Sequence, residues 1–103
     1  MPQGPQVRIT IVGGALSVSP DPARPKRGQS EQVLWQNKTG QNGVTVFFAA
    51  GSNPFAPNNN WSINNNATQP SGPITVNPGS TPYKYTVTLA GFRDLDPPVI
   101  VDP

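Results

Sequence analysis

The sequence predicts one all-β domain, an antiparallel Greek-key sandwich of seven or eight short strands spanning residues 1–103. Three observations indicate this class. Fourteen prolines and ten glycines interrupt the 103-residue chain too often for long helices. Short stretches alternate between apolar and polar residues, which is the pattern of a half-buried strand. Turn-forming residues separate these stretches at the spacing of a sandwich or barrel.

A hairpin is expected at the start of the chain. Residues 6–12 alternate so that Val7 and Ile9 face inward. The Gly13-Gly14 pair supplies a turn that requires positive φ, and residues 15–19 form the return strand.

Residues 20–31 connect this hairpin to the next strand. Three prolines remove backbone donors, so we expect an edge or polyproline-like crossover that ends in a turn at Gly28. Arg24, Lys26 and Arg27 form the only basic cluster of the sequence. We interpret this cluster as a solvated, edge-protecting loop, because no aromatic platform for a nucleic acid lies beside it.

Two apolar strands and an asparagine-rich segment follow. Residues 32–37 form a strand in which Trp35 is a predicted core residue. Residues 44–50 are apolar on nearly both faces, which favours a central strand. Residues 51–73 favour turns, with a short strand only at 61–63, and the length of this connection makes it a candidate functional loop.

The last part of the chain carries three more predicted strands. Residues 74–76 form a short strand, and a turn rich in proline and glycine follows it. Residues 83–89 alternate apolar and polar side chains. After an irregular loop, residues 99–101 resume an apolar strand.

Several of these passages resemble the cupredoxins, the small blue-copper proteins. Cupredoxins carry Tyr-x-Tyr/Phe-x-Cys, a His three residues after the Cys, a Met five residues after the His, and an apolar last strand. Earlier, a segment of the form Pro-x6-Gly leads into an apolar strand that ends in Asn. Residues 20–28, 33–37 and 83–101 resemble these passages. The resemblance covers most of the chain outside the asparagine-rich segment, and it implies a cupredoxin-like sandwich.

The copper-binding side chains of that family are missing. The resemblance assigns the four ligand positions to Gly43 (or Val44 if the register moves by one), Val87, Ala90 and Leu95. The chain has no His and no Cys, and its one methionine is Met1. A blue-copper site needs two imidazoles and a thiolate, so this ligand inventory excludes type 1 copper electron transfer.

The sequence also argues against an enzyme and against any cofactor. Catalysis of the Ser-His-Asp or Cys-His kind needs an imidazole base. Asp94 and Asp96 are a candidate pair for a cation such as calcium, but a tight site normally uses at least three carboxylates. We therefore expect Asp94 to cap a turn and Asp96 to be solvated.

The first functional hypothesis is a metal-free module for protein–protein contact or structural assembly. The former ligand end would carry a small apolar cap, unless its side chains only fill the vacated site. This cap consists of Gly43, Ala90, Gly91, Phe92, Leu95 and Pro97. A loop with Phe55, Trp61 and Ile63 would extend the binding surface.

The same residues and the proline-rich ends of the chain favour two alternatives. One is a carbohydrate-binding module in which Trp61 and Phe55 stack on sugars and asparagines bind hydroxyls; Trp61 is equally well explained as core. The other is a repeating subunit of a secreted or viral surface assembly.

Charge and composition limit the partners and suggest a compartment. The net charge of +2 is too small to imply a nucleic-acid or membrane partner, and no run is long and apolar enough for a membrane span. Charged residues make up 12% of the chain. This low charge, with abundant Asn, Pro, Ser and Thr, favours an extracytoplasmic or virion protein, although no signal peptide is recognised.

Overall fold

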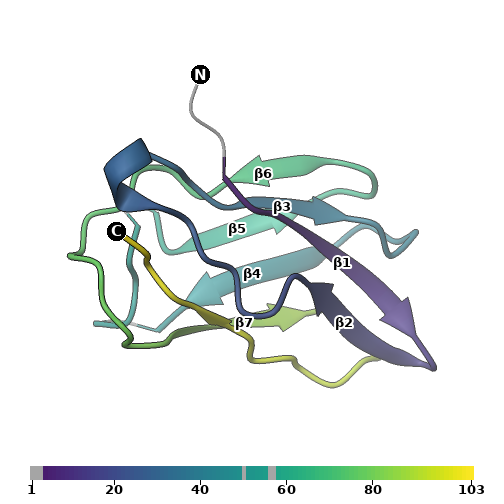
Figure 1. Ribbon diagram of the computed structural model, residues 1–103. Helices are drawn as coiled ribbons and strands as arrows, with labels where there is room; N and C mark the ends of the chain where they lie inside the picture. Colours follow the sequence, from purple (N-terminus) through teal and green to yellow (C-terminus); the bar gives the residue numbers. More distant parts are fainter. Residues whose placement is uncertain (1–3, 50, 56–57) are drawn as a thin grey trace.

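The computed structural model describes residues 4–49, 51–55 and 58–103, and it forms a sandwich of two sheets around one core (Figure 1). Within these ranges the chain forms eight strands and one short 3-10 helix, η1 (Arg27–Gln29). The strands are β1 (Gln6–Val12), β2 (Ala15–Ser19), β3 (Leu34–Asn37), β4 (Val44–Phe48), β5 (Asn60–Ile63), β6 (Thr68–Pro70), β7 (Tyr83–Thr88) and β8 (Pro98–Val99). The all-β prediction is confirmed.

Each sheet contains four strands. The order in the first sheet is β2-β1-β3-β6, and the order in the second is β5-β4-β7-β8. All neighbouring strands are antiparallel except β1 and β3, which pair in parallel. The expectation of a purely antiparallel sandwich is therefore wrong at this pair, because the long connection after β2 returns the chain to the end at which β1 begins.

The core lies between the inner faces of the two sheets, and Trp35 is at its centre. The Trp35 ring lies 4.9 Å from the ring of Trp61 and 5.4 Å from that of Tyr85, measured between centroids. Phe48 and Phe55 also contact it, each at 6.1 Å. Such tilted and edge-to-face pairs add stability beyond the burial of their surface. The prediction that Trp35 is a core residue is confirmed.

The proline-rich connection after β2 follows the edge of the second sheet. Ala23 pairs with Val99 in parallel, and Lys26 pairs with Asp102. The Ile100 N–H donates to the Ala23 carbonyl at 2.9 Å. The predicted edge crossover is thus confirmed, and η1 is the turn expected at Gly28. Prolines suit this place because an edge segment needs only one side for hydrogen bonding.

The asparagine-rich segment contains more structure than the sequence predicts. It forms β5 on the second sheet and β6 on the first, joined by a turn in which the Ala67 N–H donates to the Asn64 carbonyl at 3.0 Å. The strand expected at residues 74–76 is absent, and Ile74 makes one isolated bridge to Phe55. The segment is therefore a connection between sheets rather than one long loop.

No helix in the described part of the chain is long and apolar enough to cross a membrane.

Candidate functional site

Two of the four positions that the cupredoxin resemblance assigns to copper ligands are joined by their backbones. The Val87 N–H donates to the Leu95 carbonyl at 2.8 Å, and the Leu95 N–H donates to the Val87 carbonyl at 3.1 Å. The Val87 side chain is fully buried, and that of Leu95 is half-buried against the core. Both positions are thus occupied by apolar side chains that belong to the packing of the sandwich.

The other two positions, Gly43 and Ala90, lie at the surface just beyond the β4–β7 ladder. That ladder pairs Thr45 with Thr88, and its register, continued by two residues, brings Gly43 opposite Ala90. Both residues are exposed, and a Cβ added to Gly43 would have no neighbouring atom within 4 Å. These two positions form an open rim rather than a pocket.

The apolar cap expected at this end of the sandwich is closed by its own side chains. Phe92 and Leu95 are half-buried and pack against the core, and Pro97 is buried. The Phe92 N–H donates to the Leu89 carbonyl at 3.0 Å, which folds the loop back onto β7. The arrangement agrees with the interpretation that these side chains fill the site vacated by the copper ligands instead of forming an exposed apolar binding surface.

The buried side chain of Asn37 organises the loop that leads to Gly43. Its amide nitrogen donates to the Gln41 carbonyl at 2.8 Å and to the Ile63 carbonyl at 2.9 Å. Its amide oxygen accepts from the Thr39 backbone N–H at 3.0 Å and from the Thr39 hydroxyl at 2.7 Å. One buried amide thereby joins β3, the following loop and β5, and a fully satisfied network of this kind fixes the loop geometry.

The binding surface predicted from the asparagine-rich segment is wrong. Phe55 and Ile63 are each 2% exposed and Trp61 is 6% exposed, and all three belong to the core. Period-two alternation in β5 turns Trp61 and Ile63 inward, because an edge strand still has one buried face. Without an exposed aromatic platform at these positions, the carbohydrate hypothesis loses the residues on which it was based.

The exposed large hydrophobic side chains in the described residues are Val12, at 64%, and Phe47, at 36%. Phe47 lies on the outer side of β4, between Asn60 of β5 and Thr86 of β7. In the next row Thr45 lies between Ser62 and Thr88. We call this surface the Phe47 face, and it consists of Thr45, Phe47, Asn60, Ser62, Thr86 and Thr88. Sequence reasoning missed it because β4 reads as apolar on both sides.

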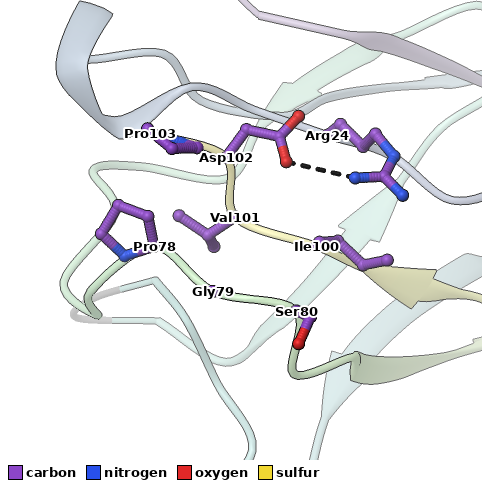
Figure 2. A pocket seen from close by; sticks show the side chains of 8 residues that line it. All are labelled: Arg24, Pro78, Gly79, Ser80, Ile100, Val101, Asp102 and Pro103. Carbon is purple, nitrogen blue, oxygen red and sulfur yellow. Dashed lines mark hydrogen bonds and ion pairs between the residues drawn. The ribbon is translucent and has the colours of Figure 1, made fainter.

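An open groove of about 320 Å³ lies between the 78–80 loop and the C-terminal residues (Figure 2). Arg24 and Asp102 are its only charged lining residues, and they pair with each other at 3.2 Å. The rest of the lining is small or aliphatic, and exposed ion pairs contribute little to stability. The two charged side chains of the groove are therefore paired with each other.

Two residues of the predicted basic cluster and one of the acidic pair make local side-chain interactions. Arg27 donates to the Val76 carbonyl, and Arg24 is paired as described above. Asp96 accepts from the Thr86 hydroxyl at 2.8 Å. No group of three metal-binding side chains occurs in the described ranges.

The core holds one ionisable group with a strongly shifted pKa. Burial raises the pKa of the Tyr85 hydroxyl well above its usual range, and the negative charge of Asp21 adds to the shift. Neither the Tyr85 hydroxyl nor the Trp35 ring nitrogen has a hydrogen-bond partner among the described residues. The group is surrounded by aromatic rings, so it is part of the core and not of a site.

Comparisons with family models, with curated proteins and with solved structures found no match.

Proposed function

We propose that the chain is a copper-free, cupredoxin-like Greek-key sandwich that acts as a protein-contact module, and that two copies meet through the Phe47 face. The first part of this proposal is supported by the sequence passages that resemble cupredoxins. It is also supported by the Val87–Leu95 bridge and by the register that leads from the β4–β7 ladder to Gly43 and Ala90.

The observation that carries the contact role is the exposed phenyl ring of Phe47 on a central strand. β4 lies between β5 and β7, so Phe47 is in the middle of a sheet rather than at its edge. Aromatic side chains at the centre of a flat patch are enriched among the residues that dominate binding energy.

The polar part of the face is compatible with a second copy of the same chain. Its six residues carry no formal charge, so two copies can approach without repulsion between like charges. At the rim, Lys84 and Asp96 carry opposite charges, and Asp96 is bonded to Thr86 of the face. In a twofold symmetric contact the same patch is used on both chains, and a neutral patch with a mixed rim suits this geometry.

Sedimentation velocity over a range of protein concentrations tests the proposal. The wild-type chain is expected to show a concentration-dependent dimer, and Phe47→Ser is expected to abolish it. Val12→Ser is the matched control, because Val12 is more exposed than Phe47 but lies on the first sheet. Equal thermal unfolding curves for the variants show that folding is retained. A wild-type chain that stays monomeric throughout, or a Phe47→Ser dimer of unchanged affinity, contradicts the proposal.

A further inference from the structure

Asn42 stands apart from the other nine asparagines of the chain, because only Asn42 is followed by glycine. The backbone N–H of residue i+1 is the nucleophile that closes an asparagine side chain into a five-membered succinimide. A side chain on that residue shields the nitrogen, and glycine has none. The chemistry is therefore least hindered at the Asn42–Gly43 bond.

The fold leaves this bond accessible. Asn42 and Gly43 are both exposed in the loop before β4. Gly43 has a φ of +90°, and the space where a Cβ would stand is empty to 4 Å. The Gly43 N–H makes no hydrogen bond to the described residues, so no acceptor among them has to be given up when this amide loses its proton.

A backbone N–H group also contacts the side-chain carbonyl of Asn42, which is the electrophile of this reaction. The Asn65 backbone N–H donates to the Asn42 side-chain oxygen at 2.8 Å. During attack on the side-chain carbonyl, this oxygen takes up negative charge. A backbone donor held at that oxygen stabilises the developing charge, as in an oxyanion hole.

We propose that Asn42 is a site of spontaneous deamidation in the folded protein, promoted by the Asn65 N–H. The deprotonated Gly43 nitrogen attacks Cγ of Asn42, a new N–Cγ bond forms, and the Cγ–Nδ2 bond breaks. The nitrogen leaves as ammonia after taking up a proton from water. Water then opens the succinimide at either carbonyl and yields aspartate or isoaspartate at position 42.

The product would change both charge and geometry in the loop. The formal net charge of +2 falls by one for each event. Isoaspartate also inserts a methylene into the backbone between Gln41, whose carbonyl is held by Asn37, and Val44, the first residue of β4. The isoaspartate form is therefore expected to unfold at a lower temperature than the fresh protein.

The test is incubation of the folded protein in mildly alkaline buffer, followed by peptide mass spectrometry and enzymatic labelling of isoaspartate. Asn42 is expected to convert about tenfold faster than any other asparagine, which is a barrier difference of about 1.4 kcal/mol. Asn42→Gln should remove the isoaspartate signal. Conversion that is spread over other asparagines, or an unmodified Asn42, overturns the proposal.

Two variants at one position test the donor. Asn65 is the second residue of the 64–67 turn, a place that proline commonly occupies, so Asn65→Pro removes the N–H within a compatible turn. Asn65→Ala keeps the N–H and serves as the control. Conversion at Asn42 should be about threefold to tenfold slower in Asn65→Pro than in Asn65→Ala, the range that corresponds to one hydrogen bond. Equal rates in two folded variants overturn the role of the donor, and the wild-type test above does not depend on either variant.

Discussion

Val87 and Leu95 exchange two backbone hydrogen bonds, at 2.8 and 3.1 Å, across the loop that follows β7. This pair closes the end of the sandwich at which the sequence resemblance expects a metal. The Val87 side chain is buried beneath the bridge, and Leu95 packs against the same core. The loop is therefore held by backbone pairing and apolar packing, which need no metal.

Restoring the missing side chains tests whether the four positions belong together. If the proposed cupredoxin-like arrangement is right, the variant carrying Gly43→His, Val87→Cys, Ala90→His and Leu95→Met should bind Cu(II) and show the strong visible absorption of a copper–thiolate bond. The positive φ of Gly43 makes the first change cost about 1 kcal/mol or more.

The control for this variant is the same set of changes with Val87→Ser, which lacks the thiolate and should stay colourless. If the four-residue variant folds and binds no copper, the positions do not converge and the resemblance to cupredoxins is misleading.

Truncation of the loop side chains should affect folding rather than association. Phe92→Ala and Leu95→Ala remove half-buried groups that pack on the core, so each is expected to lower the free energy of unfolding by about 1–3 kcal/mol. Urea titrations give this number, and sedimentation at protein concentrations where the variants are folded gives the dimer affinity. A loss of dimer without a loss of stability would indicate that the contact surface lies at the loop of Phe92 and Leu95 and not at the Phe47 face.

The buried amide of Asn37 should be essential to the loop before β4. Asn37→Ala leaves the Gln41 and Ile63 carbonyls without their donor, and we expect a loss of about 2–3 kcal/mol. Asn37→Asp keeps the shape and the acceptor oxygens but cannot donate when ionised, so its loss at neutral pH should be at least as large. Chemical denaturation measures both variants, and a loss below that of an exposed asparagine such as Asn60→Ala would contradict the account.

Tyr85 should make the protein sensitive to high pH. Because burial raises the pKa of its hydroxyl, the unfolded chain loses that proton first, at about pH 10. The stabilising contribution is complete below this pH, and as the pH rises further it falls by about 1.4 kcal/mol per unit. Tyr85→Phe should remove this dependence and cost little at neutral pH, since the hydroxyl has no hydrogen-bond partner among the described residues.

Denaturation curves recorded at neutral and at alkaline pH give the comparison. Tyr83→Phe is the matched control, because Tyr83 is half-buried on the same strand. If Tyr83→Phe removes the alkaline loss as fully as Tyr85→Phe, the burial of Tyr85 is not its cause.

The sequence was sufficient to predict those parts of the fold that depend on local alternation. The hairpin at residues 6–19, the central strand β4 and the core role of Trp35 all follow from period-two patterns and turn residues. Strand β6 could not be predicted from alternation, because it is short, polar and largely exposed at the edge of its sheet. The parallel pairing of β1 with β3 depends on where a long connection returns the chain, which no local pattern encodes.

The candidate site was harder to predict than the fold. Trp61 and Ile63 lie among asparagines, so composition suggested a surface loop, whereas pairing with β4 turns both side chains into the core. Phe47 lies in an apolar run that reads as buried on both sides. Its exposure follows from the absence of any layer over the outer side of β4 in the described residues, and that is a property of the whole sandwich.

The most direct test of the contact role is a concentration series of backbone amide NMR spectra on the wild-type chain. Shifts that depend on concentration are expected to cluster at Thr45, Phe47, Ser62, Thr86 and Thr88 and to vanish in Phe47→Ser. Spectra that do not change with concentration, or changes confined to the loop around Ala90, would contradict a contact through the outer side of β4.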